Sequence, residues 1–186
     1  MMAVMTHWTD REFTGADFRD DDLAGLQTER CVFTDCDFSG ADLAESVHLG
    51  SAFRNCRFRR TTLWHSTFRH CSLLGSVFED CRLRPAVFDE VDFTLAVLAG
   101  ADLRGTDLSG CRLRETSLVG ADLRTAVLRG ADLTGARTEG LRLQEADVRG
   151  ARIDPTLWTT ASCRGARIDV AQALAFAAAH GLDIDG

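Results

Sequence analysis

Along most of this chain a large apolar residue recurs every five residues, with a small residue two positions before it and often a glycine two positions after it. We call the apolar position the centre. Centres run without a slip from Trp8 to Ile168, and 29 of these 33 positions carry Phe, Leu, Ile, Val or Trp. A period of five fits neither an amphipathic helix, with a period of 3.6, nor a plain strand, with a period of two. The chain is therefore an internal repeat, and the repeat defines the fold.

Within one five-residue unit, the centre and the small residue two before it follow strand alternation, so both are expected to point inward. A chain that extends for about three residues and then turns, repeatedly and in register, forms a β-solenoid whose coils are spaced by roughly 4.8 Å. With four units per coil, one column of stacked centres is Leu from Leu23 to Leu143, and all ten Phe centres fall on the other three columns. The pattern predicts an all-β solenoid of about eight four-sided coils over residues 6–169.

The register ends after Ile168, and residues 170–186 are predicted to form a short C-terminal α-helix and tail. Asp169 suits a helix N-cap, the segment VAQALAFAAAH is rich in Ala, and Gly181 is placed to end the helix. A solenoid end needs a cap, which Val170, Leu174, Phe176 and Ala177 could provide. The helix is apolar almost all round, however, which exceeds what a one-sided cap needs. We therefore expect the same four residues to form a homodimer contact as well.

Composition narrows the function classes. The chain lacks a window of ~18 consecutive apolar residues and a signal peptide at its start, so a cytoplasmic location is expected. Six of the seven Cys occupy one phase of the repeat, no C-x-x-C occurs, and no catalytic motif is present. We expect no enzyme activity, no cofactor and no metal, and we interpret His48, at an inward centre, as a packing residue. The net charge of −7 argues against direct binding of nucleic acid.

Charge is distributed unevenly along the chain. Residues 10–45 hold 11 acids and three Arg, for −8, whereas residues 46–88 hold two acids and seven Arg, for +5. In the predicted solenoid Asp22 lies one coil from Asp42, and two carboxylates ~5 Å apart repel by about 1 kcal/mol in a water-like dielectric. Ala24 and Ala44 follow these two Asp, so no Arg compensates the repulsion. Such a stack indicates a functional surface, although Asp at this position also bonds turn amides for purely structural reasons.

The A-D/S-L/F-x-G pattern, as in FSGADL, LAGADL and LRGADL, resembles the pentapeptide-repeat family over residues ~6–169. The resemblance implies a right-handed quadrilateral β-helix. The segments SAFRNC, TTLWHSTF and GCRLRETSL and the ending AFAAAHGL resemble the fluoroquinolone-resistance members of that family. This closer resemblance implies binding to DNA gyrase, mimicry of a double-stranded DNA segment, inhibition of supercoiling, and dimerisation through the C-terminal ends.

The expected gyrase-binding surface consists of outward carboxylates. These are Asp17, Asp22, Asp37, Asp42, Asp102, Asp107, Asp122 and Asp132. A duplex carries one charge per ~1.7 Å, or roughly 23 over a 40 Å rod, so mimicry has to rest on shape and selected carboxylates rather than on total charge. The alternative function is a cytosolic protein-interaction scaffold that does not act on topoisomerases.

Overall fold

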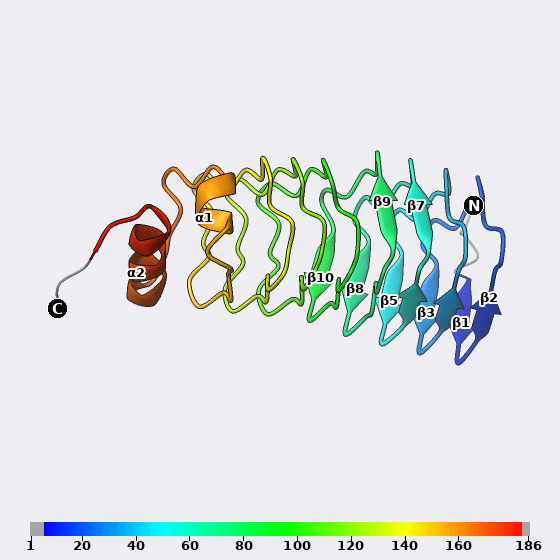
Figure 1. Cartoon of the computed structure of the whole chain (residues 1–186). Coiled ribbons are helices and arrows are strands. Elements are labelled where there is room, and N and C mark those ends of the chain that lie inside the picture. The colour runs from blue at the N-terminus through cyan, green and yellow to red at the C-terminus, as the bar shows by residue number, and fades with distance from the viewer. Residues whose placement is uncertain (1–5, 184–186) are drawn as a thin grey trace.

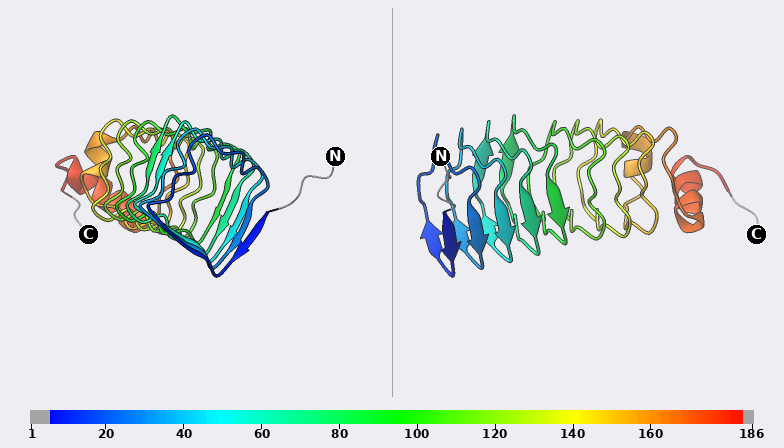
Figure 2. Two further views of the ribbon diagram at one scale, coloured as in Figure 1. Left: turned by 90° about the vertical axis from the view of Figure 1, so that its right-hand side faces the viewer. Right: turned by 180° about the vertical axis from the view of Figure 1, so that it is seen from behind.

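The computed structural model describes residues 6–183 and shows a rod of stacked coils with a helix at its C-terminal end (Figure 1). Seen from the N-terminal end, successive coils share one four-sided outline (Figure 2, left). Parallel pairs join residues that are 20 apart, from His7 with Gln27 at the start to Asp147 with Arg167 at the end. This step confirms the prediction of four pentapeptide units per coil.

Regular strands occupy only the N-terminal half of the described rod. The ten strands are β1 His7–Thr9, β2 Glu12–Thr14, β3 Gln27–Glu29, β4 Val32–Thr34, β5 Val47–Leu49, β6 Ala52–Arg54, β7 Arg57–Arg59, β8 Thr67–Arg69, β9 Val77–Glu79 and β10 Val87–Asp89. They form three sheets in the orders β1-β3-β5-β8-β10, β2-β4-β6 and β7-β9. The longest sheet spans four 20-residue steps. The regular sheet thus covers about four turns, fewer than the eight coils expected from the repeat.

The corner geometry explains why the later coils lack strands. In units without a strand, the carbonyl of the centre accepts a hydrogen bond from the amide three residues on, as Leu98 does from Ala101 at 3.1 Å. This β-turn bends the chain directly after the centre, so each side is reduced to an isolated bridge such as Asp102–Asp122. The residue two after the centre takes a positive φ, 70° at Gly100, which glycine adopts without steric cost. This requirement accounts for the position of glycine in the repeat.

Both inward positions of the repeat form the core, as predicted. Centres such as Leu43 and Leu63 are fully buried, as are small residues two before a centre, such as Ala41. Phenylalanine rings stack along the rod, with centroids 4.9 Å apart between Phe18 and Phe38 and 5.1 Å apart between Phe38 and Phe58. Stacking of this kind stabilises aromatic pairs beyond the area that they bury. The core is thus a continuous column of side chains along the axis.

The cysteines pack as small apolar residues. Burial raises the pKa of the Cys56 thiol to about 12 and that of the Cys71 thiol to about 11. A thiol with such a pKa is protonated at neutral pH and is a poor nucleophile and metal ligand. Buried thiols also donate to backbone carbonyls of the preceding coil, as Cys56 does to Phe33 at 3.5 Å. These contacts agree with the structural interpretation of the cysteine spacing.

His48 lies in the core within a small polar network. Its Nδ1 is 2.8 Å from the Thr28 hydroxyl, and its Nε2 is 3.0 Å from the Ser46 hydroxyl. Burial lowers the pKa of His48 to about 3, so the imidazole is neutral at physiological pH. Thr28 and His48 are the two polar centres of one column, and they pair directly with each other. The network satisfies these buried polar groups, as burial requires.

The last coil departs from the expected solenoid. The repeat predicts another extended side around Trp158, but Leu157–Thr160 form a short helix, α1. After Pro155 the amide of Leu157 bonds to the carbonyl of Asp154 at 3.1 Å, so the chain coils tightly instead of extending. The helix buries both Leu157 and Trp158, whereas an extended side would bury only one of two neighbouring residues. The physical gain is a fuller cover over the end of the core.

The C-terminal helix α2, Val170–Ala179, begins as the sequence predicts. Asp169 caps its N-terminus, and Gln172 completes a capping box with it. Gln172 is buried, and its Nε2 donates to the carbonyls of Val148 at 2.7 Å and Ala151 at 3.0 Å. These bonds satisfy carbonyls at the open end of the solenoid. Residues 184–186, the end of the second predicted region, lie outside the described part of the chain.

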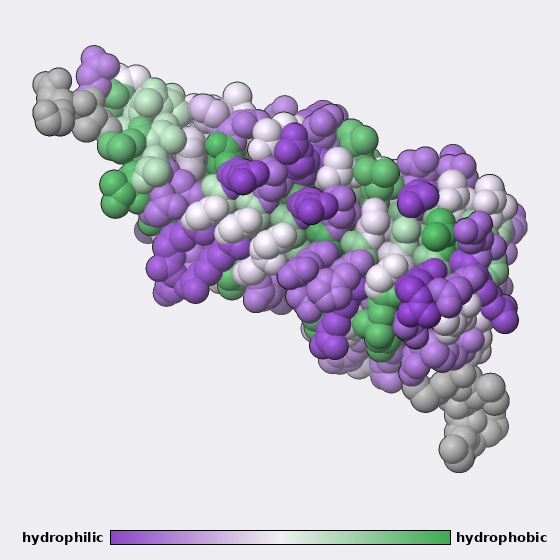
Figure 3. All heavy atoms as spheres, turned by 90° about the horizontal axis from the view of Figure 1, so that it is seen from below, coloured by the Kyte–Doolittle hydropathy of each residue, from purple (hydrophilic) through white to green (hydrophobic). Residues whose placement is uncertain are grey.

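The cap and the expected dimer contact use different sides of α2. Ala175 and Ala179 pack against the core on the side of Gln172, whereas Val170 is 78% exposed and Leu174 is 49% exposed. A hydrophobic patch marks this end of the rod in the surface view (Figure 3). The prediction that Val170 and Leu174 could serve as the cap is therefore wrong. The physical reason is that the Gln172 amide bonds to the last coil and turns these two residues outward.

Candidate partner-binding surface

Outward residues just before each centre stack into four columns, one on each face of the rod. One column, here called the carboxylate face, consists of Asp22, Asp42, Thr62, Arg82, Asp102, Asp122, Arg142 and Ser162. It brings together four of the eight predicted site residues. The other four lie on the three remaining faces: Asp17 pairs with Asp37, Asp107 with Val127, and Asp132 with Arg112. The eight carboxylates therefore do not form a single surface.

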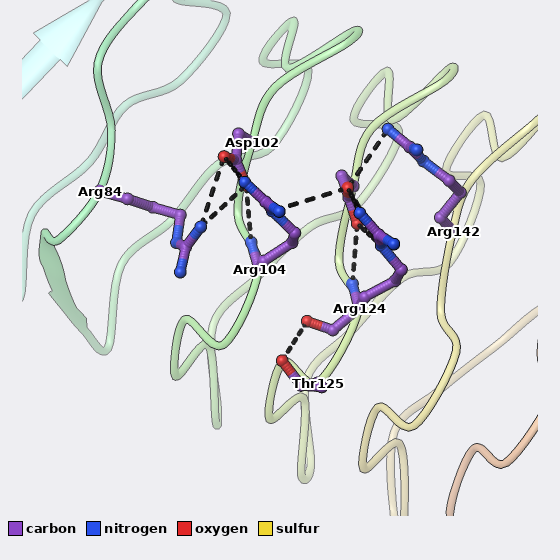
Figure 4. A network of polar contacts seen from close by, with 7 residues as sticks. Arg84, Asp102, Arg104, Arg124, Thr125 and Arg142 are labelled. Atoms are coloured by element: carbon purple, nitrogen blue, oxygen red, sulfur yellow. Dashed lines mark hydrogen bonds and ion pairs between the residues drawn. The ribbon is translucent and has the colours of Figure 1, made fainter.

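The C-terminal pair on the carboxylate face is paired with arginines (Figure 4), although the Asp102 side chain is still 48% exposed. Arg104 Nε lies 2.9 Å from an oxygen of Asp102, and Arg84 reaches the same carboxylate at 3.2 Å. Asp122 is held by Arg124 at 2.8 Å and by Arg142 at 3.2 Å, and its side chain is only 7% exposed. The hydrogen bond from Arg124 is the main cause that lowers the pKa of Asp122. These two carboxylates are ionised but largely neutralised.

The N-terminal pair on the same face is not covered. Asp22 and Asp42 are exposed, and each accepts a hydrogen bond from the backbone amide two residues on, at 3.3 Å from Ala24 and 2.9 Å from Ala44. Neither makes an ion pair within residues 6–183. The difference from Asp102 and Asp122 has a simple cause, because Ala occupies the position from which an arginine reaches back in the later coils. The expected uncompensated stack is therefore present.

Asp17 and Asp37 stack on the neighbouring face but differ in their partners. Arg19 binds Asp17 at 2.6 Å, and this hydrogen bond is the main cause that lowers the pKa of Asp17 to about 2. Asp37 is half-buried and accepts a hydrogen bond from the backbone amide of Ser39 at 2.9 Å. The next residue of this column is Arg57. Within the described residues only Asp17 of this pair therefore makes an ion pair.

Asp107 and Asp132 lie far from the N-terminal coils. Asp107 is exposed and accepts a hydrogen bond from the backbone amide of Ser109 at 2.9 Å. Asp132 accepts a hydrogen bond from the hydroxyl of Thr134 at 2.6 Å, and Arg114 lies 3.5 Å from its carboxylate. Of these two residues only Asp107 offers an accessible carboxylate.

A basic belt separates the two halves of the carboxylate face. The belt consists of Arg54, Arg57, Arg59, Arg60, Arg69, Arg82 and Arg84. Arg82 stands in the carboxylate face itself, one coil after Thr62, so the free carboxylates of the first coils do not continue into Asp102. Among the described residues the face is a short acidic patch followed by a charge-paired section.

One exposed residue beside this face was not predicted from the sequence. Trp64 is 46% exposed, and its ring packs edge-on against His65 with centroids 4.1 Å apart. It lies two residues after Thr62, in the column that holds Ala24 and Ala44 before it and Arg84, Arg104 and Arg124 after it. A large apolar residue in a column of small and charged residues was the signal that could have identified it.

The described residues contain no cluster suited to a metal. No group of three or more His, Cys, Asp or Glu side chains lies close enough together to hold an ion within residues 6–183. In the same range, no helix has both the length and the apolar character needed to cross a membrane.

Comparisons with known proteins agree with the geometry. A family model described as a pentapeptide repeat region matches residues 61–138, and a second, described as pentapeptide repeats, matches residues 29–77. The chain is 70% identical over 98 residues to the pentapeptide repeat protein MfpA of Mycobacterium tuberculosis, covering 53% of this chain and 54% of that protein. It is also 70% identical over 61 residues to MfpA of Mycolicibacterium smegmatis, covering 33% of this chain and 32% of that protein. The matched stretches thus span about half or less of these relatives.

Solved structures share the fold. QnrB1, described as a plasmid-mediated fluoroquinolone resistance protein, aligns with a TM-score of 0.67 at 20% identity over 98% of each chain. HetL from Nostoc aligns with a TM-score of 0.55 at 20% identity, over 87% of this chain and 86% of that one. The repeat, the four-sided coils and these matches lead to one conclusion. The chain belongs to the pentapeptide-repeat family.

Proposed function

We propose that this protein is a non-catalytic inhibitor of DNA gyrase that mimics a segment of duplex DNA and confers fluoroquinolone resistance. One observation carries the proposal: Asp22 and Asp42 stack on adjacent coils with no ion pair among the described residues. The similarity to MfpA and the description of QnrB1 as a resistance protein support the same function. The cytoplasm, where gyrase acts, is the proposed location.

Bare stacked carboxylates favour a cationic partner. Two carboxylates one coil apart repel by about 1 kcal/mol in a water-like dielectric, and by more near protein. A cation placed between them removes this repulsion and forms charge-assisted hydrogen bonds with both. The surface of an enzyme that binds DNA supplies such cations, because it is built to neutralise phosphates. The proposed interface is therefore the N-terminal part of the carboxylate face.

We further propose that the protein acts as a homodimer joined through α2. Val170 and Leu174 present exposed apolar surface, and half-buried Ala177 lies on the same side of the helix. Phe176 lies nearer the cap and packs edge-on against Trp158, with ring centroids 5.8 Å apart. A two-fold contact between two such helices buries the same patch on both chains. The dimer is then a longer rod with an acidic patch at each outer end.

A supercoiling assay tests this function. The wild-type protein is titrated against gyrase and relaxed plasmid, next to Asp22→Asn/Asp42→Asn and the matched pair Asp102→Asn/Asp122→Asn. We expect the first pair to weaken inhibition by about tenfold, and the second to change it little, because its carboxylates are already neutralised. Absence of inhibition by the wild type at every concentration would overturn the proposal and favour a scaffold that leaves topoisomerases alone.

A further inference from the structure

The Trp64 indole lies outside the core, and its ring contact among the described residues is with His65. Its side chain is 46% exposed, and among the described residues it makes no hydrogen bond through its ring nitrogen. The core of the rod does not need it, since the inward positions of its unit are filled by Thr61 and Leu63. Exposing so large an apolar surface costs free energy unless a partner covers it.

Two carboxylates that make no ion pair among the described residues lie on the coil before Trp64. Asp42 pairs with Thr62, two residues before Trp64, and the amide of Glu45 donates to the Trp64 carbonyl at 2.9 Å. Asp42 and Glu45 are exposed, and neither makes an ion pair within the described range. Ala44, one coil before Trp64 in the same column, has only a methyl side chain. An exposed indole thus lies one coil after two carboxylates that make no ion pair in the described part of the chain, while Arg84, the next residue of its own column, is paired with Asp102.

We infer that Trp64, Asp42 and Glu45 form a binding site for a cationic side chain of a partner protein, with Trp64 as its apolar anchor. A guanidinium or ammonium group is attracted to an indole face and is at the same time able to pair with the carboxylates. Trp and Arg are among the residue types that most often dominate protein interfaces. The identification of gyrase as the partner of this site rests on the proposed function.

This site distinguishes a protein partner from nucleic acid. Asp42 and Glu45 repel phosphates. An Arg on a protein surface, in contrast, can pair with these carboxylates and also contact the Trp64 indole. The presence of Trp64 also makes this interface differ from that of a DNA duplex, because part of the binding affinity comes from apolar contact. Apolar contact responds little to moderate salt, whereas the pairing of exposed charges weakens as salt rises.

The test measures binding to gyrase at several salt concentrations. Trp64→Ala is compared with wild type, with the conservative Trp64→Phe, and with Leu95→Ala as the matched control. Leu95 is 53% exposed but lies at the corner diagonally across the four-sided outline. We expect Trp64→Ala to weaken binding by about tenfold with an unchanged salt slope, Trp64→Phe to restore most of it, and Leu95→Ala to have no effect. Equal binding by Trp64→Ala and wild type would overturn the inference while leaving the proposed function intact.

A second measurement does not depend on gyrase. A tetra-arginine peptide is titrated into each protein, and its affinity is measured calorimetrically. We expect weaker binding to Trp64→Ala and to Asp42→Asn/Glu45→Gln than to wild type and Leu95→Ala. Equal affinity for all four proteins contradicts the site. Failure of the wild type to bind gyrase, with these differences intact, would reject the proposed partner and keep the cation site.

Discussion

Arg124 covers Asp122: its Nη2 lies 2.8 Å from the carboxylate, and only 7% of the Asp122 side chain remains exposed. Ala24 and Ala44 occupy the equivalent positions beside Asp22 and Asp42. We predict that Ala24→Arg/Ala44→Arg covers both carboxylates and weakens gyrase inhibition by about tenfold without removing any acid. The supercoiling assay measures the loss.

The control for this variant adds the same charge to the same two coils at the opposite corner. Thr14 and Thr34 pair with each other there, and each follows its centre as Ala24 and Ala44 do. Thr14→Arg/Thr34→Arg is expected to leave inhibition within about twofold of wild type, because it covers neither Asp22 nor Asp42. Equal loss in both variants would show that only net charge matters.

The buried imidazole of His48 predicts that the folded protein becomes less stable at acid pH. The folded-state pKa of His48, about 3, is below the ordinary value of 6.5, so the unfolded chain binds the extra proton between these values. Stability is therefore lost as pH falls below about 6.5, by up to about 1.4 kcal/mol per pH unit. We predict that His48→Phe loses less stability than wild type between pH 7 and pH 4.5. Denaturant unfolding measures the free energy of unfolding of each protein at both pH values. An equal loss of stability in wild type and His48→Phe would contradict the prediction.

The docking of α2 predicts a role for Gln172 in stability. Gln172→Leu keeps a helix-forming residue but leaves the Ala151 carbonyl without its donor, whereas the Val148 carbonyl still accepts from the Ala151 amide at 3.0 Å. The expected cost is about 1–3 kcal/mol, because the Ala151 carbonyl is then buried and unsatisfied. Thr159→Leu, at an exposed position on α1 outside the proposed dimer contact, is the control and is expected to be neutral. Thermal unfolding measures both, and a melting temperature of Gln172→Leu equal to that of wild type would exclude a docking role.

The exposed side of α2 predicts the oligomeric state. Leu174→Arg places a charge in the proposed contact and is expected to convert a dimer into a monomer at the same concentration. Thr159→Arg, on α1, adds the same charge outside the contact and is expected to leave the dimer intact. Light scattering gives the mass of each, and a dimer in the Leu174→Arg sample would contradict the proposed contact.

Much of the fold follows from the spacing of the sequence alone. Strand alternation around centres such as Leu43 predicts which residues are buried, and the 20-residue Leu column predicts the four-sided coil. The repeat does not predict α1, since hydrogen bonds after Pro155 replace the extended side. It also does not predict that the amide of Gln172 reaches back to the last coil, because a polar residue in an apolar helix looks like a solvated one.

The candidate surface was predictable only in part. The sequence shows an Arg two residues after Asp122, and in the structure this residue, Arg124, pairs with the carboxylate. The cross-coil contacts of Arg84 and Arg142 could not be predicted, because they depend on side-chain reach between turns. Trp64 was not among the predicted site residues, because the prediction considered carboxylates and left the other outward positions aside.

The hydrogen bonds between coils run along the rod, as from the amide of Leu103 to the carbonyl of Asp122 at 2.9 Å. Each coil is held only by its two neighbours. A pulling force applied at the two ends therefore loads these bonds lengthwise and separates coils one after another. Each 20-residue coil releases about 70 Å of chain when it yields. Under tension the rod is therefore expected to unfold in steps, one coil at a time.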